Sequence, residues 1–212
     1  MKDSVQNPRR FSWLYGFLIL LASFLFHTLF PVRYHHPERA KLSAPYIVIG
    51  NHLSMMDPIL IAYGCRRYQI RFLGKAELTK NPILRFLFGR VHMISVNRYN
   101  TDMKALRACL KVLKDGNVLG IFPEGTRFRE GIMDDMEAGI AMIALQSGAP
   151  VLPVYIQSKL RLFRRTDCWF GEEFSVLDIK ARGTNKDAAQ EVMNRIHESY
   201  RKLVLESEQM QK

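Results

Sequence analysis

Residues 46–64 read YIVIGNHLSMMDPILIAYG, and this stretch decides which fold the chain can form. Residues 46–50 are a short apolar run that ends in glycine, which is typical of a buried strand. Residues 58–64 begin with proline and are almost wholly apolar, which indicates a short helix. A strand, a polar loop and a helix in succession are typical of α/β proteins. We therefore expect an α/β fold, with residues 51–57 beyond the carboxyl end of a buried strand.

Short apolar runs alternate with helical patterns through the rest of the chain. Further strands are expected at residues 70–73, 91–96, 118–122 and 151–156, and further helices at residues 76–88, 101–114, 137–146 and 186–206. A chain of 212 residues is long enough for one such domain, but too short for two large domains and a membrane segment. The pattern predicts a single domain in which helices flank a mixed or mostly parallel sheet.

The amino-terminal run FSWLYGFLILLASFLFHTLFPV, residues 11–32, contains no Lys, Arg, Asp or Glu. Its length suits the hydrocarbon core of a bilayer, so residues 1–36 are expected to form a membrane-anchoring segment before a domain at residues 37–212. A cleaved signal peptide is disfavoured, because the run is long and aromatic-rich and no clear A-x-A site follows it. Basic residues flank both ends, so orientation stays open, as does a re-entrant or interfacial insertion broken near Pro31.

The formal net charge of +11 favours anionic partners, namely nucleic acid, phosphorylated substrates or a membrane surface. The basic residues are dispersed and no nucleic-acid-binding motif is present, so we expect no nucleic-acid partner. The three cysteines, Cys65, Cys109 and Cys168, form no C-x-x-C pair. Their spacing indicates neither a zinc site nor a disulfide framework, and it fits a reducing, cytosol-facing environment.

The loop NHLSMMDP, residues 51–58, contains the first pair of residues suited to catalysis. A carboxylate at Asp57 that faces the imidazole of His52 would fix its tautomer and stabilise the imidazolium. In the alternative interpretation His52 is an ordinary loop histidine, and Asp57 caps a helix that starts at Pro58. Capping is expected of Asp57 in either case.

A second loop, IFPEGTRF at residues 121–128, follows the strongest predicted strand. Pro123 and Gly125 favour a tight turn with exposed N–H groups, Thr126 offers a hydroxyl, and Arg127 offers a planar fork for phosphate or carboxylate. The pattern indicates an anion-binding loop. A surface turn with an ion pair between Arg127 and Glu124 is the alternative.

Together, NHxSxxD and FPEGTR resemble the motifs of PlsC-like glycerolipid acyltransferases, the lysophosphatidic acid acyltransferase family. The segment GKAELTKNPILRFLFGRVHMISVNR, residues 74–98, is similar to the second block of that family. VLPVYI, residues 151–156, is similar to the fourth, with Pro153 as its marker. The resemblance covers residues 45–157.

The resemblance implies direct transfer of a fatty acyl group from acyl-CoA or acyl carrier protein to the free hydroxyl of 1-acylglycerol-3-phosphate, giving phosphatidic acid. It implies that His52 is the general base and that Asp57 orients it. The residues implied to surround the glycerol phosphate are Lys75, Arg98, Glu124, Gly125, Thr126 and Arg127. No metal or tightly bound cofactor is implied, and the catalytic domain of this membrane-associated family is expected to face the cytoplasm.

Three questions stay open. Glycerol-3-phosphate or another lysolipid is an alternative acceptor, whereas a catalytically silent membrane scaffold is disfavoured because both motifs are intact. The apolar side chains of residues 83–88 either line an acyl groove or, as the favoured interpretation, pack in the core. KLRLFRR, residues 159–165, is either a secondary membrane contact or an exposed basic loop.

Overall fold

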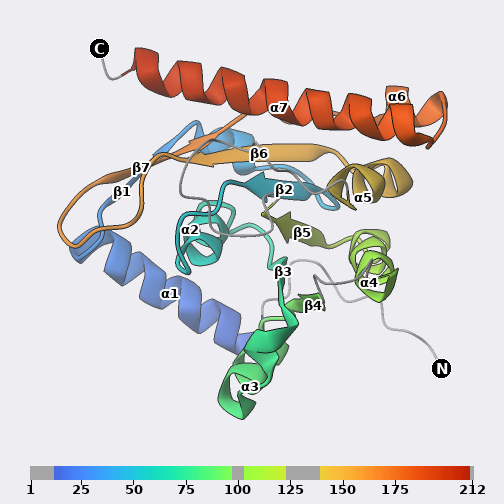
Figure 1. The fold of residues 1–212 in the computed structure, drawn as a ribbon. Coiled ribbons are helices and arrows are strands. Elements are labelled where there is room, and N and C mark those ends of the chain that lie inside the picture. The colour runs from blue at the N-terminus through green and yellow to red at the C-terminus, as the bar shows by residue number, and fades with distance from the viewer. Residues whose placement is uncertain (1–11, 97–102, 123–138, 211–212) are drawn as a thin grey trace.

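In the computed structural model, which describes residues 12–96, 103–122 and 139–210, helices cover both faces of one seven-stranded sheet (Figure 1). The strands are β1 (Val32–His35), β2 (Ile47–Gly50), β3 (Ile70–Lys75), β4 (Ile94–Val96), β5 (Val118–Ile121), β6 (Val151–Ile156) and β7 (Thr166–Phe170). Their order is β1-β7-β6-β2-β5-β3-β4, and neighbouring strands are parallel except β6 and β7. The expected α/β fold with a mixed sheet is confirmed.

Two groups of helices cover the two faces of the sheet. The helices are α1 (Trp13–Thr28), α2 (Asp57–Gly64), α3 (Pro82–Arg90), α4 (Met103–Lys114), α5 (Gly139–Ser147), α6 (Leu177–Ala181) and α7 (Lys186–Gln209), with the 3-10 turns η1 (Pro37–Ala40) and η2 (Ala76–Thr79). Ile47 and Ile49 of β2 share an apolar core with α4 to α7, whereas Val48 shares one with α1 and α2. Both faces of β2 are therefore buried, which explains its continuous apolar sequence.

The expected elements are present, with one difference in the middle of the chain. The single helix expected over residues 76–88 is divided into η2 and α3. The division occurs at Asn81, whose side chain accepts hydrogen bonds from the N–H groups of Ile83 and Leu84, with Pro82 in the first turn of α3. The sequence patterns did not predict β1, β7 or α6.

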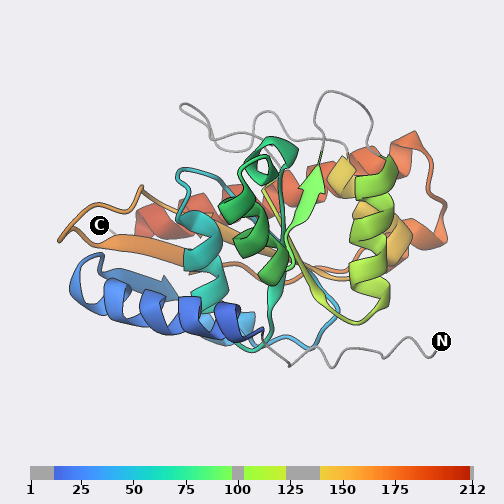
Figure 2. The same cartoon turned by 90° about the horizontal axis from the view of Figure 1, so that it is seen from below.

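Helix α1 occupies most of the uncharged amino-terminal run. Its inward side chains, including Tyr15 and Phe26, are buried, whereas Trp13 and Leu20 point outward and are exposed. Figure 2 views the face of the sheet on which α1, α2 and α3 lie. None of the helices within the described ranges has the length and apolarity needed to cross a bilayer. The expected anchoring helix is therefore not confirmed.

Candidate active site

The loop after β2 emerges at the carboxyl end of the sheet, between β5 and β6. Asn51 fixes its start. The buried Asn51 Nδ2 donates to the carbonyl of Ile156 at 2.8 Å, and the N–H of Ile156 donates to Asn51 Oδ1 at 2.7 Å. The side chain thus pairs with the end of β6 as a backbone would, while the main chain turns out of the sheet. No pattern in the sequence marks Asn51 as a functional residue.

The expected pair of His52 and Asp57 forms inside this loop. His52 Nδ1 lies 3.0 Å from Asp57 Oδ2, and the Asp57 side chain is fully buried. Because a carboxylate accepts hydrogen bonds and does not donate them, Nδ1 carries the proton and Nε2 carries the lone pair. The geometry therefore suits His52 to take up a proton at Nε2.

Asp57 also closes the loop, and this corrects one expectation. Its carboxylate accepts from the N–H groups of Leu53 at 2.6 Å and Ser54 at 2.5 Å, and from Ser54 Oγ at 2.7 Å. The predicted helix-capping role is wrong, since Met56 holds the N-cap position of α2 and makes no side-chain cap. The loop folds back on itself, so the Asp57 carboxylate accepts hydrogen bonds from N–H groups that precede it in the chain rather than from those of α2.

Two aromatic rings connect His52 to the interior. The imidazole of His52 stacks on Phe122 with 4.3 Å between centroids, and Phe122 stacks on Phe72 with 5.7 Å between centroids. Phe72 lies so close to Gly120 of β5 that a Cβ there would overlap its ring. Glycine at this position therefore lets the aromatic stack lie flat on the sheet.

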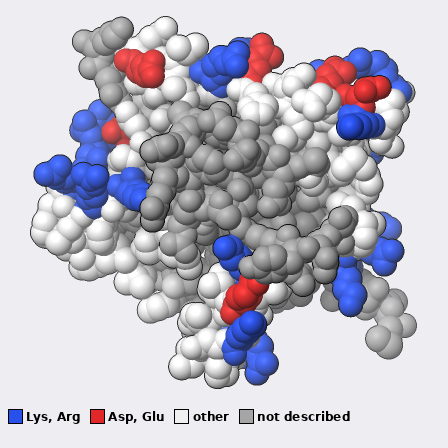
Figure 3. Space-filling model, in the orientation of Figure 1, with Lys and Arg blue, Asp and Glu red and all other residues white. Residues whose placement is uncertain are grey.

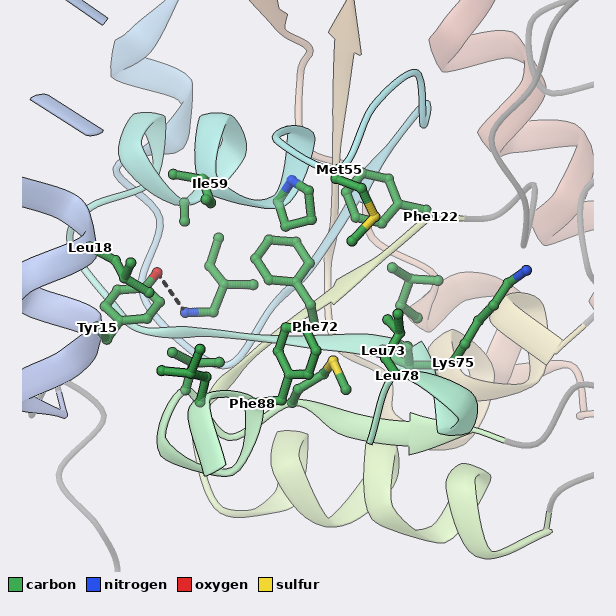
Figure 4. A pocket seen from close by; sticks show the side chains of 18 of the residues that line it. Tyr15, Leu18, Met55, Ile59, Phe72, Leu73, Lys75, Leu78, Phe88 and Phe122 are labelled. Carbon is green, nitrogen blue, oxygen red and sulfur yellow. Dashed lines mark hydrogen bonds between the residues drawn. The ribbon is translucent and has the colours of Figure 1, made fainter. Parts of the chain in front are cut away.

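A cavity of about 440 Å³ extends from His52 between the sheet and helices α1 and α3 (Figure 4). Met55, Phe122 and Lys75 lie toward one end, and Tyr15 and Leu18 of α1 lie at the other. The lining is mainly apolar, and its volume is within the range of known ligand pockets. An extended apolar ligand therefore fits the cavity.

The cavity settles the question about residues 83–88 in part. Leu87 and Phe88 line it, whereas Ile83 and Phe86 are exposed and lie outside its lining. Helix α3 has no buried residue, so packing in the core is wrong for this segment. Only its last two apolar residues line the cavity as expected of an acyl groove.

Of the residues predicted to bind the phosphate, Lys75 is the one that lies within the described ranges. This residue ends β3, is exposed, and lines the same cavity as His52. The other expected site residues lie outside the described residues, namely Arg98, Glu124, Gly125, Thr126 and Arg127. Strands β2, β3, β4 and β5 are mutually parallel, so their carboxyl ends lie at one edge of the sheet.

Neither metal nor thiol chemistry is indicated by the described side chains. Within the described ranges, no group of three or more His, Cys, Asp or Glu side chains is arranged to hold a metal ion. All three cysteines are buried and unbonded to one another. Burial raises the pKa of the Cys65 thiol to about 12, so Cys65 is not a thiolate at neutral pH.

Comparison with known proteins identifies the family of the chain. A family model described as Acyltransferase matches residues 31–157, which include His52, Asp57 and Lys75. The chain belongs to this family. The matched range covers β1 to β6 and the loop that holds the His52–Asp57 pair.

Two relatives of this chain share one description, and the chain spans less than two thirds of the length of the first. A 1-acyl-sn-glycerol-3-phosphate acyltransferase of Bacillus subtilis is 29% identical over 59% of this chain and 62% of its own length. One from Streptococcus pneumoniae is 26% identical over 98% of this chain and 78% of its own. The crystal structure of the acyltransferase PlsC from Thermotoga maritima superimposes with a TM-score of 0.68 at 23% identity, covering 92% of this chain and 78% of that one. This last likeness shows the fold.

Proposed function

We propose that the protein transfers a fatty acyl group from an acyl thioester to the free hydroxyl of 1-acylglycerol-3-phosphate, giving phosphatidic acid. The observation that carries the proposal is the His52–Asp57 pair, whose imidazole lines a long apolar cavity. Similarity to 1-acyl-sn-glycerol-3-phosphate acyltransferases of Bacillus subtilis and Streptococcus pneumoniae supports the choice of acceptor. The proposed donor is acyl-CoA or acyl carrier protein.

The chemistry needs a base and a positioned thioester. Nε2 of His52 takes the proton of the acceptor hydroxyl as its oxygen attacks the thioester carbonyl. The tetrahedral intermediate then collapses, the carbon–sulfur bond breaks, and the proton passes from the imidazolium to the departing thiolate. Asp57 holds the Nδ1 proton throughout and stabilises the positive charge of the imidazolium.

The cavity is the proposed binding site of the acyl chain. Its walls are formed by apolar side chains of α1, α2, β3 and α3, with Phe72 and Phe88 near its middle (Figure 4). Burying an alkyl chain there contributes about 0.8 kcal/mol per methylene. A chain seated along these walls would place its thioester carbon beside His52.

Lys75 is the proposed first ligand of the acceptor phosphate. It lines the same cavity as His52 and lies toward the end where Phe122, the stacking partner of His52, is found (Figure 4). An ammonium group there would neutralise a phosphate monoester. The resemblance to the family adds Arg98 and the loop 124–127 to this site. We therefore include Arg98 and residues 124–127 in the proposed phosphate site.

Acyl transfer with purified full-length protein tests the function directly. Lysophosphatidic acid and glycerol-3-phosphate are offered separately, each with acyl-CoA and with acyl carrier protein, and products are identified by mass spectrometry. We expect phosphatidic acid from lysophosphatidic acid. If only glycerol-3-phosphate gives a product, the acceptor is glycerol-3-phosphate and not lysophosphatidic acid. If no combination gives a product, the proposed reaction is refuted.

We further propose that α1 attaches the protein to a membrane, with the catalytic domain on the cytoplasmic side. Trp13, Phe17, Leu20 and Phe24 recur at helical spacing and are each more than half exposed. The opposite side chains, such as Leu14 and Leu18, line the cavity. A helix with one apolar face on the protein and the other exposed suits insertion into the plane of the interface.

A further inference from the structure

The connection between β6 and β7, residues 157–165, forms a turn with two apolar residues at its apex. Arg161 and Arg164 form an isolated antiparallel bridge, and the N–H of Arg164 donates to the carbonyl of Arg161 at 3.1 Å. Leu162 and Phe163 between them are 55% and 69% exposed. We call residues 157–165 the β6–β7 tip.

The conformation of Phe163 is unusual for its residue type. Its φ is +56°, in the left-handed region, where Asn and Gly are favoured and bulky residues are strained. A turn selected only for folding would place a small polar residue there. An exposed phenylalanine at a strained apex therefore points to a role outside the fold.

The β6–β7 tip is also strongly basic. Residues 157–165 include Lys159, Arg161, Arg164 and Arg165 and no acidic residue. Arg165 lies 3.9 Å from Asp167, whereas no carboxylate within the described ranges pairs with the other three. Figure 3 shows Lys and Arg side chains gathered at the edge of the molecule where β6 and β7 turn. The apolar apex is thus surrounded by cationic groups.

The tip lies against the carboxyl-terminal end of α1. The N–H of Phe163 donates to the carbonyl of Leu29 at 2.7 Å. Leu29 is the residue that follows the end of α1. The exposed stripe of α1, from Trp13 to Phe24, therefore leads toward the tip. In Figure 3 the surface over α1 is uncharged and ends at the basic group. At its other side the tip follows Ile156, which Asn51 ties to the catalytic loop.

We propose that the β6–β7 tip is a second membrane contact that selects anionic bilayers. Leu162 and Phe163 enter the headgroup region, and Lys159, Arg161 and Arg164 bind lipid phosphates. An apolar apex ringed by basic groups fits an anionic bilayer, which offers hydrocarbon and negative charge together. The inference rests on the proposed attachment by α1. It adds a contact that fixes the distance of the catalytic loop from the lipid headgroups.

Vesicle binding by the full-length protein tests the proposal. Binding to phosphatidylcholine vesicles and to vesicles that also contain phosphatidylglycerol is measured by sedimentation at low ionic strength. The variants are Arg161→Gln/Arg164→Gln and Phe163→Asn. Asparagine readily adopts a positive φ, so the second variant should keep the conformation of the turn. Arg201→Gln/Lys202→Gln is the matched control, since both side chains are exposed on α7, across the sheet from α1.

Each basic residue near an anionic surface strengthens binding about fivefold, so the double arginine variant should bind anionic vesicles about 25-fold more weakly. Its binding to phosphatidylcholine should be unchanged. Phe163→Asn should weaken binding to both kinds of vesicle, and the α7 variant to neither. Turnover of an acceptor dispersed as monomers should be native in all variants, which separates this contact from the acyl-transfer chemistry.

Three results would overturn the inference. If the double arginine variant binds anionic vesicles as tightly as the native protein, the tip makes no lipid contact, although α1 attachment stands. If the native protein binds neither kind of vesicle, the α1 attachment falls as well. If the double arginine variant binds vesicles like the native protein but has a higher KM for acylated carrier protein, the basic residues contact an acidic protein donor instead.

Discussion

Asn51 has no reactive group, yet its two hydrogen bonds to Ile156 determine where the loop that carries His52 leaves the sheet. We predict that Asn51→Asp lowers kcat by about 10–100-fold with little change in acceptor KM, because small displacements of a base have large effects on rate. A carboxylate at this position would accept from the N–H of Ile156 but repel its carbonyl oxygen.

Asn117→Asp is the matched control for Asn51→Asp. Asn117 is also buried and lies before β5, at the opposite end of the sheet. The Tm of both variants is measured, and only the change at Asn51 should lower kcat. Equal kcat values after correction for the folded fraction would mean that Asn51 has no positioning role.

Lys75 and Arg127 should act on the acceptor rather than the donor. A hydrogen bond to a charged group contributes roughly 1.5–3 kcal/mol, so alanine at either position should lower acceptor kcat/KM by about one to two decades. Lys80→Ala is the control, since Lys80 is exposed but outside the cavity lining. A loss confined to the KM of the acyl donor would remove Lys75 and Arg127 from the phosphate site.

Residue type and spacing predicted that His52 and Asp57 would pair, and the two side chains are in contact. Lys75 was implied only by the resemblance to the family, and its role stays a prediction. Residue type and spacing did not predict Asn51, whose partner Ile156 lies 105 residues away, or the stack of Phe122 on His52. The capping role of Asp57 failed for a related reason. Sequence gives the position of a carboxylate, but the fold of the loop decides which N–H groups reach it first.

At the scale of elements, α1 combines two apolar faces with different partners. Leu18 lines the cavity, whereas Leu20 is 70% exposed. We predict that Leu18→Trp shifts the enzyme toward shorter acyl donors, while Leu20→Trp leaves the preference unchanged. Each methylene excluded from the cavity should lower kcat/KM nearly fourfold, since it loses about 0.8 kcal/mol of burial. The measurement is kcat/KM across a series of acyl-CoA chain lengths.

Identical chain-length profiles for the native protein, Leu18→Trp and Leu20→Trp would contradict the assignment of the cavity to the acyl chain. A general loss at every length would show only a damaged fold, so the Tm of each variant is measured beside its kinetics. The prediction concerns the shape of the profile and not its height.

Apolar periodicity predicted most strands and helices but not the use made of α1. The uncharged run of residues 11–32 satisfies the length criterion for a spanning helix, yet α1 ends at Thr28 and Val32 begins an edge strand of the sheet. Hydropathy alone does not distinguish a residue facing lipid from one facing a protein core. The partner β7 that pairs with β1 lies far along the chain.

At the scale of the whole molecule, the order of the strands was beyond the sequence patterns. β2 lies between β5 and β6, and this places the loop of His52 in the crevice where ligands of α/β proteins commonly bind. The antiparallel pairing of β6 with β7 sends the β6–β7 tip out beside α1. Such long-range pairings are decided by packing of the complete domain.

We predict that the full-length protein stays on membranes during a high-salt wash. Apolar burial contributes about 25 cal/mol per Å², whereas a basic residue near an anionic leaflet adds only about 1 kcal/mol, so the α1 face should dominate. Replacing Phe17, Leu20 and Phe24 with Gln should release the protein. These substitutions suit the test better than truncation near Pro37, which would remove β1 from the sheet.

Release of the native protein by salt alone would show a charge-held peripheral enzyme and refute attachment through α1. If the variant with Gln at Phe17, Leu20 and Phe24 stays on the membranes, the attachment is made by the β6–β7 tip and not by α1. Fractionation of cells, followed by washes with high salt and with carbonate, distinguishes these outcomes.

The turnover of His52→Ala with lysophosphatidic acid tests the central claim most directly. Asp57 would still accept three hydrogen bonds, from the N–H groups of Leu53 and Ser54 and from Ser54 Oγ, so the loop should remain folded. We predict that kcat falls by about 10²–10⁴ while Tm and vesicle binding stay near native values, because a positioned general base contributes that factor. Near-native turnover by His52→Ala would contradict the proposed mechanism.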